Sequence, residues 1–228
     1  MNLCDHLPLA DRQQAGRLLA RDLEFLADAP GLIVLGLPRG GVVVAAEIAR
    51  ALHAPLDVLV VRKIGLPGQP EFAIGALASG GVQVLDMAAA AQVPPARLQS
   101  VIRSEMVELA RRETAYREGR PAPLLRGRTV ILADDGVATG ATMEAAARAV
   151  RHQQARQVVV CAPVATIEAA QRLAPWVDAT VFGALPRPFG AVGNWYASFG
   201  DTSDAEVLEA LRSARLPQAE TASAAARP

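Results

Sequence analysis

The sequence has two cysteines, a single lysine and no long apolar run. The scarcity of cysteine and of long apolar runs argues against a disulfide-rich protein and against a membrane-spanning one. Cys4 lies in a polar N-terminal stretch and Cys161 in an apolar run, so they make neither a disulfide framework nor the spacing of metal ligands. No apolar run approaches the roughly 18 residues of a membrane-spanning helix, and no cationic segment followed by an apolar one opens the chain. We therefore expect a soluble, cytoplasmic protein.

The chain also has no excess of charge of either sign, since its 228 residues include 23 Lys and Arg and 23 Asp and Glu. This balance gives no reason to expect nucleic acid or a membrane as a partner, so any anion site must be local. Lys63 is the only lysine among the cationic residues. A site that requires a compact ammonium would explain it, and chance explains it equally well.

Short continuous apolar runs alternate with amphipathic segments along most of the chain, which indicates an α/β fold. An amphipathic helix is expected from Pro8 to about Ala27. Buried strands are expected at 31–37, 56–63, 129–134, 157–165 and 178–185, with helices at 39–52, 140–152 and 166–174. This order predicts a mainly parallel, twisted sheet flanked by helices, with right-handed crossovers.

The segment between 64 and 119 interrupts this alternation and indicates an insertion. Residues 64–92 are rich in Gly and Pro and predict a mobile loop followed by a small hairpin at 72–85. A long amphipathic helix is expected at 95–119. We expect one domain over residues 1–216, with a core at about 30–185, a small hood at about 184–200 and a disordered tail at 217–228.

The run "VILADDGVATGAT" at 130–142 places two adjacent acids at the end of a buried strand, directly before a helix. Ligands of parallel sheets bind at this edge. Asp134 and Asp135 offer only acceptors and suit a vicinal diol, while a helix that begins near Thr139 or Gly140 offers N–H groups to a phosphate. Together they point to a ribose 5-phosphate. A helix cap or a metal site would also explain the acids, and Thr-Gly-x-Thr is also an ordinary cap.

Cationic side chains are expected at the same edge of the sheet. Arg39 follows the first strand within "GLPRGG", and Arg62 and Lys63 end the second strand. Taken singly, each is also what an exposed loop or strand end contains. Their convergence on one edge favours an anion larger than a single phosphate, such as pyrophosphate.

The run at 130–142 resembles the phosphoribosyl pyrophosphate-binding motif of type I phosphoribosyltransferases, and the order of elements over about 30–185 is similar to that fold. The stretches "LGLPRGG", "VVRKIG", "PEFAIGA" and "AVGNWY" resemble a bacterial phosphoribosyltransferase-like group. The resemblance implies transfer of ribose 5-phosphate from phosphoribosyl pyrophosphate to a nitrogenous base, with release of pyrophosphate. It names no base. The alternatives are a regulatory protein that binds phosphoribosyl pyrophosphate without turnover and a nucleotide or sugar-phosphate hydrolase.

The resemblance also implies a role for each site residue. Asp134 and Asp135 would hold the ribose hydroxyls, and the 5′-phosphate would lie against Ala138, Thr139, Gly140, Ala141 and Thr142. The pyrophosphate would meet Arg62, Lys63 and the loop of Leu37, Pro38, Arg39 and Gly40, which in the family often contains a non-proline cis peptide. Arg39, Lys63 and the two acids would be the catalytic residues, with Mg²⁺ held chiefly by the substrate's own oxygens.

The predicted roles of the hood residues, of Glu71 and of a second copy of the chain each have an alternative explanation. Phe189, Trp195 and Tyr196 are candidates for stacking on the base, although packing inside the lobe or a dimer contact explains each equally well. Glu71 is a candidate acceptor of the proton that the base loses, and an ordinary solvated loop glutamate is the alternative. The family implies a homodimer, to which the helix at 95–118 or the N-terminal helix could supply the contact.

Overall fold

The computed structural model describes residues 3–214, except for the side chains of residues 69–71 and 73. Its centre is a five-stranded parallel sheet in the order β2-β1-β6-β7-β8. These strands are β1 (Ile33–Gly36), β2 (Leu56–Val58), β6 (Thr129–Ala133), β7 (Gln157–Val164) and β8 (Ala179–Ala184). The predicted α/β class with a mainly parallel sheet is confirmed.

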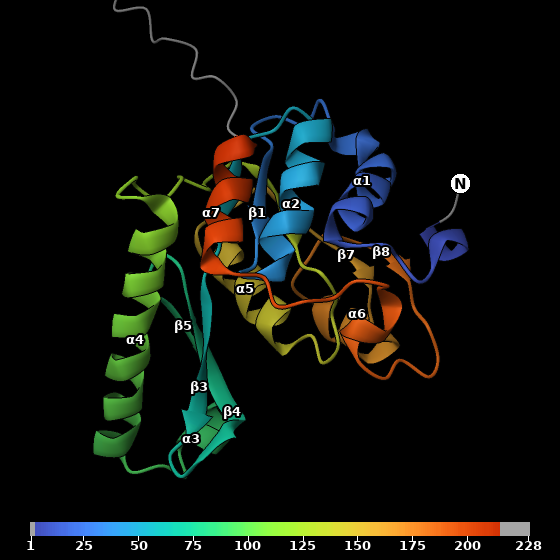
Figure 1. Ribbon diagram of the computed structural model, residues 1–228. Helices are drawn as coiled ribbons and strands as arrows, with labels where there is room; N and C mark the ends of the chain where they lie inside the picture. Colours follow the sequence, from blue (N-terminus) through green and yellow to red (C-terminus); the bar gives the residue numbers. More distant parts are fainter. Residues whose placement is uncertain (1–2, 215–228) are drawn as a thin grey trace, which may run out of the picture.

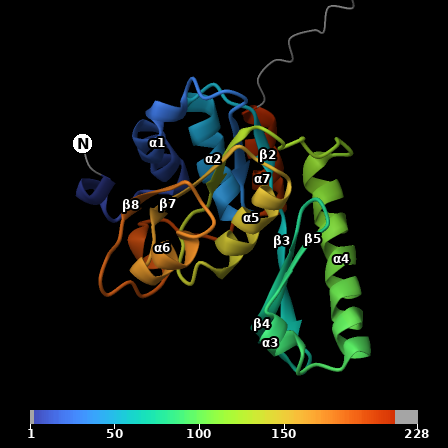
Figure 2. The same cartoon turned by 180° about the vertical axis from the view of Figure 1, so that it is seen from behind.

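Helices cover both faces of this sheet (Figures 1 and 2). One face carries α1 (Arg12–Asp22), α2 (Gly40–Ala51) and α7 (Asp204–Ser213), and the other carries α5 (Ala141–His152) and α6 (Ile167–Leu173). In β6, Ile131 belongs to the apolar core on the first side, while Val130 and Leu132 belong to the core on the second. Successive side chains of a strand point to opposite faces, which is why a strand covered on both sides is apolar throughout.

A second, antiparallel sheet of β3 (Val61–Leu66), β4 (Gln69–Ala78) and β5 (Val82–Leu85) forms most of the insertion. It is followed by α3 (Met87–Ala90) and α4 (Pro95–Arg117), and α4 extends with the small sheet away from the parallel sheet (Figures 1 and 2). We call β3, β4, β5 and α4 the arm. The predicted hairpin and long helix are present, but residues 64–66 and 69–71 are strand rather than loop. Pro67 and Gly68, with a φ of 89° at Gly68, form the tight turn between β3 and β4.

The predicted strand at 56–63 was wrong, because it is two strands in two sheets. The chain leaves the parallel sheet after Val58, and at Val60 its backbone begins to pair with Ser79 instead. The N–H of Val60 donates to Oγ of Ser79 at 2.9 Å, and the N–H of Ser79 donates to the carbonyl of Val60 at 2.9 Å. A continuous apolar run does not reveal such a change of sheet.

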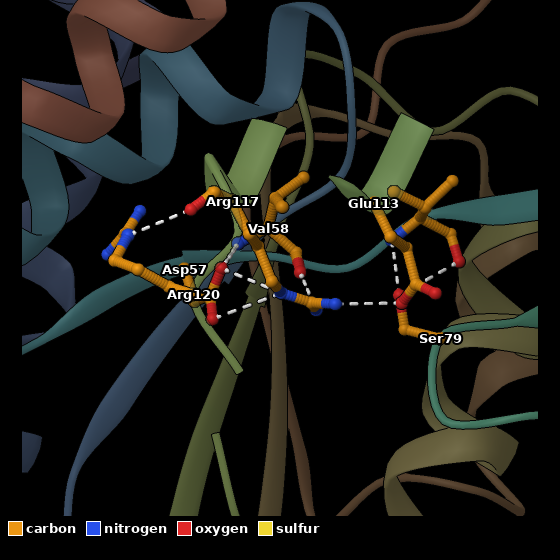
Figure 3. A network of polar contacts seen from close by, with 7 residues as sticks. Asp57, Val58, Ser79, Glu113, Arg117 and Arg120 are labelled. Atoms are coloured by element: carbon orange, nitrogen blue, oxygen red, sulfur yellow. Dashed lines mark hydrogen bonds and ion pairs between the residues drawn. The ribbon is translucent and has the colours of Figure 1, made fainter. Parts of the chain in front are cut away.

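A buried polar network joins the arm to the parallel sheet (Figure 3). Arg117, at the end of α4, lies 3.4 Å from both carboxylate oxygens of Asp57 in β2 and donates to the carbonyl of Val58 at 2.9 Å. It also pairs with Glu113 at 2.8 Å. Because Arg117 and Asp57 are both buried, the network fixes the last turns of α4 against the sheet.

The ends of the chain add shorter elements. The N-terminal helix is shorter than predicted, because Asp11 accepts a hydrogen bond from the N–H of Gln14 and α1 begins only at Arg12. In the described part of the chain, 3₁₀ turns lie at Leu3–His6, Glu24–Leu26 and Val192–Trp195. The helix α7 was not predicted, and the tail predicted at 217–228 lies outside the described residues. None of the described helices is both long and apolar enough to cross a membrane.

Candidate functional site

The loops after β1 and β6 lie side by side at the carboxyl edge of the parallel sheet. The N–H of Leu37, just after β1, donates to the carbonyl of Ala133 at the end of β6 over 3.0 Å. The two loops lead into α2 and α5, and the first N–H groups of a helix have no partner within it. Two helix N-termini therefore point their positive ends at this edge, which favours an anion.

Asp134 and Asp135 lie at the end of β6 and are both half-buried. Oδ1 of Asp134 accepts a hydrogen bond from the backbone N–H of Asp135 at 2.9 Å. Burial, reinforced by the neighbouring carboxylate of Asp135, raises the pKa of Asp134 well above its usual range. Oδ2 of Asp135 pairs with Nε of Arg12 at 2.7 Å. One of the two acids therefore already has a cationic partner within the fold.

Arg12, at the start of α1, is a site residue that sequence reasoning missed. Its Nη1 donates to the carbonyl of Gly200 at 2.9 Å, and its guanidinium lies over the ring of Phe199, 4.0 Å from the centroid. Its side chain is only 13% exposed. Arg12 thus joins α1, Asp135 and the segment after the last 3₁₀ turn. It precedes Asp135 by 123 residues, and no local pattern marks so distant a contact.

Two glycines let the start of α2 approach the acids. A Cβ at Gly40 would lie 1.9 Å from Oδ2 of Asp135 and 2.5 Å from Nε of Arg12. A Cβ at Gly41 would lie 2.7 Å from the carbonyl oxygen of Ala133 and 2.8 Å from Oδ1 of Asp134. The "RGG" run is therefore needed for the contact between the α2 N-terminus and the acid pair.

The loop of residues 138–142 forms a cradle at the N-terminus of α5. Gly140 has a φ of 74° and precedes Ala141, the first residue of the helix. Two side chains from the segment after β7 hold the loop: Oγ1 of Thr166 donates to the carbonyl of Ala138 at 2.6 Å, and Nη1 of Arg172 donates to the carbonyl of Thr139 at 3.0 Å. Ala138 and Thr139 are exposed, so an anion has access to this helix end.

The loop before α2 contains the residues predicted to meet a pyrophosphate. Leu37 is buried, whereas Arg39 is exposed. The peptide bond between Pro38 and Arg39 is cis, as the family resemblance implied. Within the described residues, the Arg39 side chain has no hydrogen bond or ion pair. Its charge is therefore available to a ligand.

Arg62 and Lys63 were expected at the end of a strand of the parallel sheet, and this was wrong. Both lie inside β3 of the arm, where Arg62 is in register with Leu77 and Lys63 with Ala76. The reason is the change of sheet after Val58. Arg62 pairs with Glu105 of α4 at 2.8 Å, so much of its charge is already compensated, while Lys63 is exposed.

The predicted hood residues lie in the segment between β8 and α7, in different surroundings. Tyr196 is buried, and its hydroxyl donates to the carbonyl of Asp135 at 2.6 Å. Burial, followed by the Asp135 carboxylate, raises the pKa of this tyrosine. Nε1 of Trp195 donates to the carbonyl of Phe189 at 2.9 Å, and their rings lie 6.4 Å apart. The hydrogen bond from Tyr196 therefore holds the backbone of the acid pair in place. Phe189 and Trp195 are only partly buried.

The carboxylates of the structure are the candidate ligands of the predicted Mg²⁺ and the candidate acceptors of the proton that the base loses. Among the side chains that the structure describes, which leave out Glu71, no cluster of three or more His, Cys, Asp and Glu residues is arranged to hold a metal ion. The acid pair alone would leave most positions around Mg²⁺ to ligand oxygens and water. The Glu71 side chain lies outside the described part of the structure, and its role as a proton acceptor stays a prediction.

The structure is therefore an α/β protein in which an acid pair lies beside two helix N-termini at the carboxyl edge of a parallel sheet, the edge where such folds bind their ligands. The phosphoribosyl transferase domain family matches residues 11–183, and the chain belongs to this family. The match covers both loops of the site.

Named relatives agree with this membership. Two proteins of Mycobacterium tuberculosis, from strains CDC 1551 and H37Rv, are each 45% identical over 203 residues, and their names assign them provisionally to the phosphoribosyl transferases. The alignment covers 88% of this chain but 46% of theirs, so the chain spans about half the length of these relatives. The crystal structure of TT1426 from Thermus thermophilus is 46% identical with a TM-score of 0.79, covering 88% of this chain and 96% of that one.

Proposed function

We propose that the chain transfers the phosphoribosyl group of phosphoribosyl pyrophosphate to a nitrogenous base and releases pyrophosphate. The observation that carries this proposal is the placement of Asp134 and Asp135 between two helix N-termini, with the α2 terminus packed against them at Gly40 and Gly41. Acceptors for a diol and donors for phosphates then lie at one edge of the sheet.

In this proposal the ribose lies on the loop after β6. Asp134 and Asp135 accept hydrogen bonds from the 2′- and 3′-hydroxyls, and the 5′-phosphate lies against residues 138–142. Because Arg12 already pairs with Asp135, a hydroxyl must either share that carboxylate or displace the guanidinium. A carboxylate oxygen has two lone pairs, so sharing requires no loss of the ion pair.

The diphosphate lies toward Leu37, Pro38, Arg39 and Gly40. As the bond between C1′ and the diphosphate oxygen breaks, both electrons leave with the diphosphate, and the exposed guanidinium of Arg39 stabilises the growing charge. A nitrogen of the base then bonds to C1′, and the proton it loses passes to solvent water. Arg62 and Lys63 are proposed only as secondary cations for the diphosphate. Arg62 would first have to leave its ion pair with Glu105.

Mg²⁺ fits this site as an ion bound mainly through the ligand. When bound, it would supply positive charge to the diphosphate, and the carboxylates of the acid pair would help to hold it. Phe189 and Trp195, which are only partly buried, are the proposed stacking surface for the base. Tyr196 positions the acid pair instead, through its hydrogen bond to Asp135.

The test is incubation of the protein with phosphoribosyl pyrophosphate, Mg²⁺ and a panel of purine and pyrimidine bases, with pyrophosphate and nucleotide both measured. Pyrophosphate release that requires a base and is matched by nucleotide supports the proposal. Release without a base would indicate a hydrolase. Binding without any release would indicate a protein that senses phosphoribosyl pyrophosphate.

A further inference from the structure

A polar cavity of about 250 Å³ lies beside the Pro38–Arg39 peptide. Its other lining residues are Arg111 and Arg112 of α4 and Asp204 at the start of α7. The arm helix therefore reaches the loop before α2. Three arginines, from two separate parts of the chain, are among the five residues that line this small space.

The carboxylates nearby compensate only part of this positive charge. Glu108 accepts hydrogen bonds from Nε and Nη2 of Arg111 and from Nε of Arg112, at 2.8 to 2.9 Å. The hydrogen bonds from Arg111 and then Arg112 lower the pKa of Glu108 to about 2, so it is ionised at neutral pH. Glu108 and Asp204 therefore oppose three arginines. Among the described residues, the remaining N–H groups of Arg111 and Arg112 have no hydrogen-bond partner, so they can bind an anion.

The C-terminal turns of α4, close to Arg111 and Arg112, are anchored to the rest of the fold. The hydroxyl of Tyr116 donates to Oδ1 of Asp204 at 2.6 Å, which joins α4 to α7. One residue further, Arg117 is held in the buried network with Asp57 (Figure 3). Arg111 and Arg112 lie about one and a half turns before this anchor, so their backbone is preorganised beside the cavity.

We propose that Arg111 and Arg112 form, with Arg39, a binding site for the diphosphate group of the ligand, so that the arm supplies two of its cations. This inference rests on the proposed function for the identity of the ligand. A diphosphate fits because the cations reach the cavity from two separate elements and can meet oxygens of both phosphates. Gly40, next to Arg39, contacts Asp135, so a diphosphate here continues directly from a ribose on the acid pair.

The test is calorimetric titration of the full chain with inorganic pyrophosphate and, separately, with ribose 5-phosphate. The Arg111→Gln/Arg112→Gln variant should bind pyrophosphate at least about tenfold more weakly, because charge-assisted hydrogen bonds are lost, and should bind ribose 5-phosphate as the wild type does. The matched control is Arg97→Gln/Arg103→Gln, which removes two exposed arginines from the same helix. It should leave both affinities unchanged.

Equal loss of pyrophosphate affinity in the two double variants would overturn the inference, because only the net charge would then matter. Unchanged affinity in Arg111→Gln/Arg112→Gln would overturn it too. If that variant fails to fold, Arg111→Lys/Arg112→Lys keeps both charges, and an undiminished pyrophosphate affinity in it would count against binding by the planar guanidinium forks.

The two proposals fail in different ways. If the wild type binds ribose 5-phosphate, but substituting Arg111 and Arg112 leaves the pyrophosphate affinity unchanged, only the proposed diphosphate site is refuted. A chain that binds pyrophosphate through these arginines, yet neither binds ribose 5-phosphate nor consumes phosphoribosyl pyrophosphate, refutes the proposed function and leaves the anion site standing.

Discussion

Gly40 and Gly41 are adjacent in sequence, yet substituting each by alanine should have different consequences. At Gly40 the new Cβ would meet Oδ2 of Asp135 at 1.9 Å and Nε of Arg12 at 2.5 Å, which are both side-chain atoms. At Gly41 it would meet the carbonyl oxygen of Ala133 at 2.7 Å and Cα of Asp134 at 2.8 Å, which are backbone atoms of β6 and its loop. A clash with a side chain can be relieved by rotating that side chain. A clash with the backbone of a buried strand can be relieved only by moving α2.

The free energies follow from this difference. Overpacking costs typically about 1–3 kcal/mol, and replacing a helical glycine by alanine recovers about 0.5–1 kcal/mol. Gly40→Ala should therefore lower the free energy of unfolding by at most about 1 kcal/mol, and Gly41→Ala, at the upper end of the range, by about 2 kcal/mol. Displacing the Asp135 carboxylate in Gly40→Ala removes a hydrogen bond to a charged group, about 1.5–3 kcal/mol, or about 10- to 150-fold in affinity for ribose 5-phosphate.

Urea denaturation, with the midpoint compared at constant m-value, and calorimetric titration with ribose 5-phosphate measure these two quantities. The result that would refute the reasoning is a Gly40→Ala variant that binds ribose 5-phosphate as the wild type does. Equal losses of stability in the two variants would also contradict the distinction between side-chain and backbone obstruction.

Three further outcomes follow from contacts around the site. Arg117→Met should lower the free energy of unfolding by about 3–5 kcal/mol, because Asp57 is left buried without its partner, and adding Asp57→Asn should restore part of the loss in a urea titration. Tyr196→Phe should cost about 1–2 kcal/mol in the same assay, since the carbonyl of Asp135 loses its donor; an unchanged midpoint would speak against that role. Because burial raises the pKa of Asp134, acidification should protonate it before an ordinary aspartate and remove an acceptor, so the preference for ribose 5-phosphate over 2-deoxyribose 5-phosphate should fall as pH is lowered. Both ligands carry the same phosphate, so a ratio of affinities independent of pH would contradict this last prediction.

The parts of the fold that sequence could predict are those fixed by neighbouring residues. β6 is apolar throughout because both faces of the sheet are covered, and the acids with the loop after them follow it directly in sequence. The hairpin turn at Gly80 and Gly81 was likewise found from its glycines, which have φ values of 85° and 76°.

The misses have two causes. Some signals were present and not used: Ser203 and Glu206 form a capping box at the start of α7, and Pro67-Gly68 is a typical turn pair rather than a mobile loop. Other features depend on contacts between distant residues. The pairing of Arg12 with Asp135, and the arrival of Arg111 beside Arg39, follow from how α1 and the arm pack, and no local pattern encodes them.

The most direct test of the central claim compares the affinities for ribose 5-phosphate and 2-deoxyribose 5-phosphate in the wild type and in Asp134→Asn/Asp135→Asn. If the acid pair holds the diol, the wild type should prefer the ribose compound by about tenfold or more, and the variant should lose that preference while still binding the phosphate. A preference that survives in the variant, or a wild type that binds neither compound, would contradict the claim.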